Sequence, residues 1–356
     1  MSLNDLFRQL TLTLAACLGM ACAGPATAQQ GGQPTLAPAA SGITPAAASA
    51  AQNAQGAPIF VLNSLDANIS VIDPQSWAVA KTIPTGKEPH HLYLTPDEKS
   101  VIVANAAGDS LTFIDPRTAE VQRVIRNIID PYHLRFSPDM KWLVTVANRL
   151  NHIDLYRWDG QTPTLVKRLA SGKTPSHIWI DSKSTTVYTT MQDSNELVAV
   201  DLASQSIKWR VPTGPLPADV FGTSDDRHLL VANTGGFDVQ VYDLSVQPAR
   251  LIKTLRTGEG AHAFRAAGDG RHVWVSNRVA DTISRIDTQR LEVVGEVKAP
   301  GGPDCMEVTP DGKLLVSSRW VKRMTVIDAV TGRVERQVKV GKSPHGIWTL
   351  NHAKRQ

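Results

Sequence analysis

A unit of about 42 residues recurs seven times along this chain of 356 residues, and this repeat restricts the fold more than any other feature. The copies are registered most easily through one aspartate in each, and the successive spacings are 42, 44, 42, 42, 44 and 41 residues. The seven aspartates are Asp73, Asp115, Asp159, Asp201, Asp243, Asp287 and Asp328. Short β-branched runs precede them, separated by turns such as Thr309-Pro-Asp-Gly-Lys313, which is typical of antiparallel strands.

Seven copies of a four-stranded unit predict an all-β, seven-bladed β-propeller over residues 58–350. The first copy has only three strand candidates and lacks the strand that opens every other copy. The missing sequence reappears at the far end, where Gly341 to Leu350 repeats the opening segment and then stops. We therefore expect the C-terminal strand to complete the first blade, because its pairing covers a strand edge that would otherwise be exposed.

The first 28 residues predict a secretory signal peptide. An apolar stretch from Leu10 to Ala23 follows Arg8, and Ala26-Thr-Ala28 provides a cleavage site. In the alternative interpretation, Leu14 to Cys17 is a lipobox and leaves a lipid-anchored Cys17. Either interpretation predicts a periplasmic or secreted protein with no transmembrane segment in the mature chain.

Residues 29–57 are rich in Ala, Gln, Gly and Pro, which predicts a disordered tether. Residues 351–356 are expected to form a short tail. Removal of the signal leaves Cys305 as the single cysteine, so no intramolecular disulfide is expected. The chain has no Cys-x-x-Cys-His motif, which excludes covalent c-type haem, and its small net charge of +4 argues against a nucleic-acid partner.

The repeats also resemble a known family. The second strands end in sequences such as Val103-Ala-Asn105 and Val275-Ser-Asn277, and the third strands continue as in Ile114-Asp-x-x-Thr118. These motifs resemble YVTN-type β-propeller repeats, which are similar to the WD40-like propellers of the cytochrome d1 and quinoprotein amine dehydrogenase group. The resemblance covers roughly residues 58–350 and implies the propeller fold. It leaves the activity open, because that family includes oxidoreductase subunits, binding proteins and proteins of unknown role.

Histidines concentrate at two adjacent positions of the segment that opens each repeat, directly after a proline or its replacement. The first position holds His90, Tyr132, Ser176, Ala218, His262, Asp304 and His345, and the second holds His91, His133, His177, Asp219, Ala263, Cys305 and Gly346. Six of the ten histidines of the chain lie at these positions. Because each segment starts the innermost strand of a blade, we expect all seven to meet at one mouth of the central channel.

Imidazole, carboxylate and thiolate groups are ligands for zinc, copper or iron. The predicted metal ligands are the polar residues of the second position, namely His91, His133, His177, Asp219 and Cys305. Those of the first position, His90, His262, His345 and Asp304, are predicted to form a second tier that contacts a cofactor.

Two alternatives remain at the channel. The same funnel suits a planar cofactor or an anionic substrate, with Arg135, Arg265 and Arg319 as charge partners. In the second alternative the histidine ring is purely structural, since a histidine after proline can hydrogen-bond the backbone of the neighbouring blade.

Three function classes follow from these alternatives. The first is an exported metal- or cofactor-binding propeller, acting as an accessory or redox partner. The second is a periplasmic oxidoreductase, or a lyase that uses channel histidines, although the sequence identifies no catalytic residue. The third is a scaffold that presents a propeller face to a protein partner.

Overall fold

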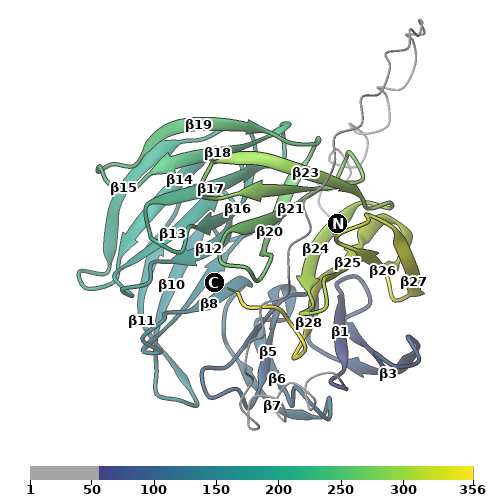
Figure 1. Ribbon diagram of the computed structural model, residues 1–356. Coiled ribbons are helices and arrows are strands. Elements are labelled where there is room, and N and C mark those ends of the chain that lie inside the picture. The colour runs from purple at the N-terminus through teal and green to yellow at the C-terminus, as the bar shows by residue number, and fades with distance from the viewer. Residues whose placement is uncertain (1–55, 356) are drawn as a thin grey trace, which may run out of the picture. The chain divides into compact units, whose positions relative to one another are not determined.

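The computed structural model describes residues 56–355, which form seven antiparallel sheets of four strands each. This arrangement confirms the predicted seven-bladed propeller (Figure 1). The predicted signal peptide and residues 29–55 of the predicted tether lie outside the described residues. Within residues 56–355, no helix is long and apolar enough to cross a membrane.

The four strands of each blade follow one another outward from the central channel. From the innermost strand to the outermost, the first blade consists of β28 (Pro344–Thr349), β1 (Ile59–Asn63), β2 (Asn68–Ile72) and β3 (Val79–Pro84). The second blade consists of β4 (Pro89–Leu94), β5 (Val101–Asn105), β6 (Ser110–Ile114) and β7 (Val121–Arg126). The third blade consists of β8 (Pro131–Phe136), β9 (Trp142–Ala147), β10 (His152–Trp158) and β11 (Pro163–Ala170).

The other four blades follow the same order. They consist of β12 (Pro175–Ile180), β13 (Thr186–Met191), β14 (Glu196–Asp201) and β15 (Ser206–Pro212); β16 (Pro217–Gly222), β17 (His228–Asn233), β18 (Asp238–Asp243) and β19 (Arg250–Arg256); β20 (Ala261–Ala266), β21 (His272–Asn277), β22 (Thr282–Asp287) and β23 (Glu292–Lys298); and β24 (Pro303–Val308), β25 (Lys313–Ser318), β26 (Arg323–Asp328) and β27 (Val334–Lys339). Two short 3-10 helices, η1 (Ala106–Gly108) and η2 (Arg319–Val321), lie between strands.

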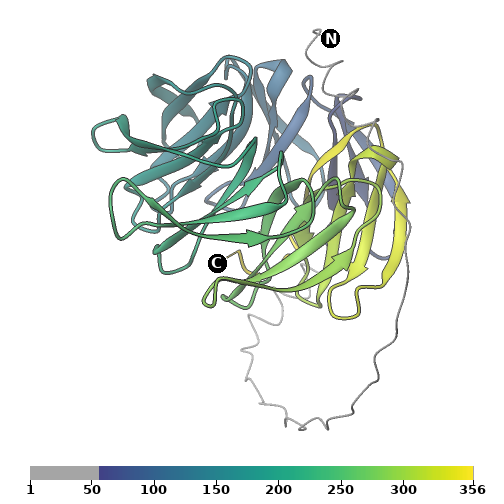
Figure 2. The same cartoon turned by 90° about the horizontal axis from the view of Figure 1, so that it is seen from above.

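The C-terminal strand closes the ring, as the sequence predicts. β28 pairs antiparallel with β1, with Val61 opposite Ile347 and Phe60 opposite Trp348. Figure 1 shows this join between the earliest and the last coloured segments of the chain. After β28 the chain turns back toward the middle of the ring, where both views place its end (Figures 1 and 2).

The core lies between the blades. Buried apolar residues form seven clusters, and each cluster joins the facing sides of two successive blades. The cluster that contains Val61, Leu315 and Ile347 lies between the seventh and first blades and completes the circle. The second strand of each blade is almost wholly buried and the fourth is mostly exposed, so the apolar runs of the sequence correspond to the inner strands.

The repeated aspartates stabilise turns. Each accepts a hydrogen bond from the backbone N–H two or three residues later, as in Gln75 to Asp73 at 2.8 Å and Val330 to Asp328 at 3.0 Å. Asp and Asn favour such local bonds, which explains why this residue marks the period of the repeat.

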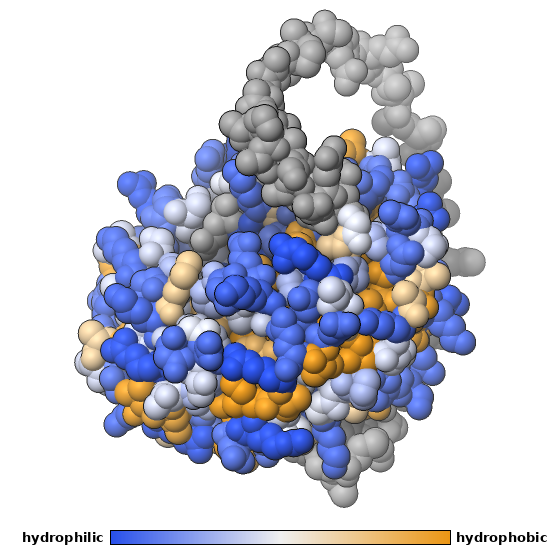
Figure 3. All heavy atoms as spheres, turned by 90° about the horizontal axis from the view of Figure 1, so that it is seen from below, coloured by the Kyte–Doolittle hydropathy of each residue, from blue (hydrophilic) through white to orange (hydrophobic). Residues whose placement is uncertain are grey.

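The outer surface is mainly hydrophilic, with apolar residues exposed in patches. Figure 3 shows such patches between hydrophilic residues on one face. Exposed apolar side chains on the described surface include Leu65, Trp320 and Val330, which are 75%, 50% and 90% exposed. Exposed apolar side chains are ordinary on the surface of a folded protein.

Replacement of Trp348 by alanine tests the contribution of ring closure. Its side chain is fully buried on β28 against residues of the first two blades. We expect Trp348→Ala to lower the free energy of unfolding by about 3–5 kcal/mol, the usual cost of removing a buried aromatic side chain. Urea unfolding followed by circular dichroism gives this value. Trp320→Ala, at a half-exposed tryptophan, is the matched control, and an equal loss in both variants would contradict the prediction.

Candidate functional site

The backbone directs two consecutive side chains of each inner strand toward the channel. In all seven blades the first strand contains one extra residue relative to the second at the histidine positions, for example where Pro89 pairs with Asn105 but His91 pairs with Ala104. A bulge of this kind changes the direction of side chains and is frequent next to active sites.

The residue before each of these segments has a positive φ in all seven blades. Five of the seven are not glycine, and the set is Glu88, Asp130, Thr174, Leu216, Gly260, Gly302 and Ser343. A left-handed conformation is costly for a residue with a side chain, above all for the β-branched Thr174. The fold therefore imposes the same bend before every channel segment, even where the local sequence disfavours it.

The two predicted positions form separate layers in the channel. All seven residues of the second position line one cavity, and none of the seven residues of the first position does. The sequence predicts the second-position residues as a ring at one channel mouth and the polar first-position residues as a second tier beside it. The structure places the second-position residues at the floor of a cavity and the first-position residues in a deeper layer.

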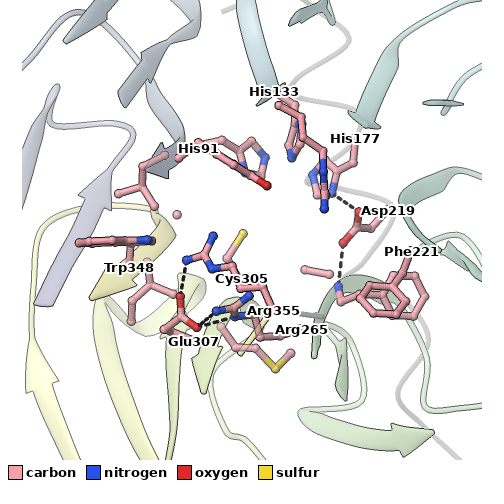
Figure 4. Close-up of a pocket in the computed structure, with 18 of the residues that line it drawn as sticks. His91, His133, His177, Asp219, Phe221, Arg265, Cys305, Glu307, Trp348 and Arg355 are labelled. Atoms are coloured by element: carbon pink, nitrogen blue, oxygen red, sulfur yellow. Dashed lines mark hydrogen bonds and ion pairs between the residues drawn. The ribbon is translucent and has the colours of Figure 1, made fainter. Parts of the chain in front are cut away.

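Three of the predicted metal ligands come together on the cavity floor. One ring nitrogen from each of His91, His133 and His177 lies within 4.8 Å of the others. The ring centroids are 4.5 Å apart for His91 and His133, 4.6 Å for His91 and His177, and 4.8 Å for His133 and His177. Figure 4 shows the three side chains on the same side of the cavity.

Each of these histidines has a buried ring nitrogen without a hydrogen-bond partner. These atoms are Nε2 of His91, Nδ1 of His133 and Nε2 of His177. A buried polar atom without a partner costs about 1–3 kcal/mol, so three of them on one cavity floor require an explanation. We call His91, His133 and His177 the His triad.

Asp219 lies next to the His triad. The sequence predicts it as a metal ligand, but in the structure it forms a hydrogen bond with one of the three histidines. Its Oδ1 accepts a hydrogen bond from Nδ1 of His177 at 2.9 Å, and its Oδ2 accepts one from the backbone N–H of Phe264 at 2.7 Å. The proton on Nδ1 leaves Nε2 of His177 with a free lone pair. Histidines that bind metals usually make such a bond through the other ring nitrogen.

Burial keeps His91 and His133 uncharged. It lowers the pKa of His91 and His133 well below the usual value, and the neighbouring histidines lower it further. A neutral imidazole has a lone pair available for a metal, whereas an imidazolium has none.

The deeper layer contains His90, His262, His345, Asp304 and Tyr132. The ring of His90 lies 3.7 Å from that of His345 and 4.0 Å from that of Tyr132, measured between centroids. Nδ1 of His345 donates to the backbone carbonyl of His90 at 2.8 Å. Of the six channel histidines, His345 therefore makes the kind of backbone contact that a structural ring predicts.

Asp304 is the electrostatic centre of the deeper layer. It is fully buried and contacts Arg278 at 2.7 Å, Arg319 at 2.9 Å and Nε2 of His262 at 2.8 Å. Burial alone would raise the pKa of Asp304, but Arg278, His345, His262 and Arg319 hold it well below the usual value. Two guanidinium groups already neutralise this carboxylate and would repel a cation, although His262, Asp304 and His345 lie close enough together to be ligands.

Cys305 lines the cavity without joining the His triad. Its Sγ lies 3.6 Å from Nδ1 of His345. Burial raises the pKa of the Cys305 thiol well above its usual value, and Asp304 and Asp219 add to the effect. The thiolate is the form that binds metals, so the surroundings of Cys305 disfavour it as a ligand.

The walls of the cavity come from a third position of the repeat, two residues after the second. They consist of Tyr93, Arg135, Trp179, Phe221, Arg265, Glu307 and Trp348. The sequence predicts Arg135 and Arg265 as charge partners, but the aromatic members and Glu307 are not among the predicted site residues. The same alignment that locates the histidines would have located them.

Arg355 enters the cavity from the C-terminal segment. Its Nη2 donates to Oε2 of Glu307 at 2.9 Å, and the buried Arg265 forms an ion pair with the same carboxylate. Burial and the charge of Arg355 lower the pKa of Arg265 to about 10, so the guanidinium group of Arg265 stays charged at neutral pH. Nothing in the repeat pattern predicts Arg355, because the tail lies outside it.

These features define a seven-bladed propeller whose channel contains a layer of buried histidines beneath a mixed aromatic and arginine wall. The chain belongs to the YNCE-like beta-propeller family, whose model matches residues 19–355. No curated protein matches it significantly.

Solved structures show the same fold at low sequence identity. A functionally unknown protein from Desulfotomaculum acetoxidans has a TM-score of 0.71 at 16% identity, over 82% of this chain and 98% of that one. The periplasmic gluconolactonase PpgL of Pseudomonas aeruginosa has a TM-score of 0.69 at 18% identity, over 82% and 98%. The dihydro-heme d1 dehydrogenase NirN has a TM-score of 0.63 at 16% identity, over 84% and 76%. The NirN match agrees with the cytochrome d1 resemblance of the repeats, and identities this low establish the fold alone.

The buried neutral histidines predict that the metal-free protein loses stability in acid. For His262, burial and the charge of Arg278 lower the pKa to about 4. The unfolded chain then binds more protons than the folded one below pH 6.5, so stability falls as pH falls from 6.5 toward 4. His262 alone should contribute a loss of about 2 kcal/mol between pH 8 and pH 5.

Urea unfolding at several pH values measures this dependence. His262→Gln should reduce its slope, whereas His228→Gln, at a histidine outside the channel layers, should leave the slope unchanged. Equal slopes in all three proteins would contradict the assignment.

Proposed function

We propose that this protein is an exported metal-binding propeller and that the His triad holds zinc, copper or iron. The observation that carries the proposal is the set of three unpartnered ring nitrogens on the cavity floor. Imidazole suits all three metals, and a bound ion would provide the partner that each nitrogen lacks.

The arrangement favours a functional metal centre over a structural one. Structural zinc sites are usually closed by four protein ligands, whereas catalytic sites combine three with an open position. Three histidines contribute here, and the space beyond them is the cavity. A metal at this position would be accessible to a small molecule, which supports an enzyme, or a binding protein for a small ligand, as the class of function.

Within the His triad, Asp219 would act as a positioning residue. Its hydrogen bond fixes the tautomer of His177 and the direction of its free lone pair. The metal, when bound, would supply Lewis acidity to a molecule in the cavity. The residues of the chain would hold the ion, orient its ligands and restrict access to it.

Export is part of the same proposal. It rests on the apolar segment and cleavage site within residues 1–28. The similarity to a structure described as a periplasmic gluconolactonase is consistent with such a location.

Removal of one histidine tests the metal centre. Purified without a metal-affinity tag and dialysed against zinc, the protein should hold about one equivalent by elemental analysis. His133→Ala should lower zinc affinity by more than about 100-fold, a larger loss than removal of a supporting residue usually causes. His228→Ala is the matched control and should keep the metal. Full zinc content in a folded His133→Ala variant would refute the site.

Asp219→Asn tests the positioning role. An asparagine side chain can keep the size of Asp219 but not its charge or its fixed acceptor toward His177. We expect zinc affinity to fall about 10–100-fold with the three ligands still present. Competition with a chelator measures this change. An affinity equal to that of the unaltered protein would show that Asp219 has only a structural role.

A further inference from the structure

The cavity above the His triad has a restricted size. Its volume is about 140 Å³. A cavity of about 150 Å³ can bind one benzene molecule, so this cavity accommodates a ring-sized group. The molecule that enters the cavity, or the part of it that does so, is therefore about the size of a single substituted ring.

The walls provide flat apolar surfaces. Trp179 and Phe221 are neighbours with ring centroids 4.9 Å apart, and Phe221 continues to Phe264 at 6.0 Å. Tyr93 lies elsewhere on the same wall. Aromatic walls of this kind bury the face of a planar or cyclic molecule.

The cavity also carries an excess of positive charge. Three guanidinium groups, from Arg135, Arg265 and Arg355, face two carboxylates. Arg135 stacks over Trp179 at 4.1 Å and makes no ion pair within residues 56–355. The carboxylate of Glu307 is shared by two arginines, and that of Asp219 is engaged by His177 and a backbone N–H. The histidines add no negative charge.

Two buried donors at the cavity lack acceptors. Nε1 of Trp348 and Nε of Arg355 have no hydrogen-bond partner in the described chain. Figure 4 shows the indole nitrogen of Trp348 turned toward the cavity, with Arg355 close to Glu307 on the same side. Unpartnered donors beside excess positive charge favour a ligand with an anionic acceptor group.

We propose that the cavity binds a small organic carboxylate with a flat ring or ring-sized body. The carboxylate would accept hydrogen bonds from Trp348 and Arg355, and the body would lie against Trp179 and Phe221. This inference rests on the proposed function, because a divalent ion on the His triad would add two positive charges to the same cavity. The carboxylate would occupy the open side of the metal centre.

A pair of probes of equal size tests the inference. Benzoate and benzamide have the same shape, but only benzoate is an anion. Titration calorimetry with the zinc-loaded protein should show benzoate binding at least 10-fold more tightly than benzamide. Equal affinities, or no binding of either probe, would overturn the inference.

The variant Arg355→Gln tests whether the preference for benzoate over benzamide arises in the cavity. This residue is near the end of the chain, and its replacement should weaken benzoate binding about 5–10-fold while benzamide binding stays the same. Arg333→Gln, at an exposed arginine of the seventh blade, is the matched control. Equal benzoate affinities in the two variants would also overturn the inference.

The same experiments separate this inference from the metal centre. Elemental analysis reports zinc independently of the probes. Bound zinc without any preference for benzoate would retain the metal centre and reject the carboxylate ligand. A benzoate preference that Arg355→Gln weakens, in a protein that never holds metal, would support the carboxylate ligand and reject the metal centre.

Discussion

The pairing of β28 with β1 is the constraint on which the site depends. Without β28 the inner edge of β1 would be unpaired, and the first blade would lack the strand that the other six blades present to the channel. The join at Val61 and Ile347 fixes the number of blades at seven. The channel radius follows from that number, and so does the distance across which side chains from different blades can meet. Residues as far apart in sequence as His91 and His345 become neighbours only because the ring closes.

Neutral histidines concentrate in this channel at an energetic cost, and the two layers offset it differently. In the deeper layer, His345 bonds a backbone carbonyl and His262 bonds Asp304. Each of these bonds accounts for one ring nitrogen, while Nε2 of His345 and Nδ1 of His90 also lack a hydrogen-bond partner. In the His triad, the bond between His177 and Asp219 fixes a ring and leaves its other nitrogen unpartnered. Duplication of a structural histidine does not explain why three histidines, each with an unpartnered ring nitrogen, lie together on the floor of a cavity.

Much of the fold could be predicted from the sequence because it depends on a periodic pattern. The aspartates that register the repeats act in turns, and turn chemistry is local. The concentration of histidines was also visible, since aligned repeat positions must meet around a closed ring. A second tier could be predicted from the adjacent repeat positions, but the sequence did not show which tier lines the cavity and which lies deeper. That depends on a bulge and on a positive φ at residues such as Thr174, and neither feature has a sequence signature there. Arg355 was missed because a tail outside the repeat can return to the channel without any periodic signal.

Charge distinguishes the two layers as candidate ion sites. A cation among His262, Asp304 and His345 would lie beside Arg278 and Arg319, which already share the carboxylate. At the His triad, the carboxylate of Asp219 accepts a hydrogen bond from Nδ1 of His177. The negative charge of Asp219 is therefore close to the triad, and no guanidinium group of the described residues neutralises it. Both layers bring potential ligands together. Because Coulomb interactions are strong in a buried channel, this difference in charge favours the His triad over the deeper layer as the metal site. The arginines of the deeper layer would then stabilise the fold beneath the centre, while Arg135 and Arg355 face the molecule that approaches it.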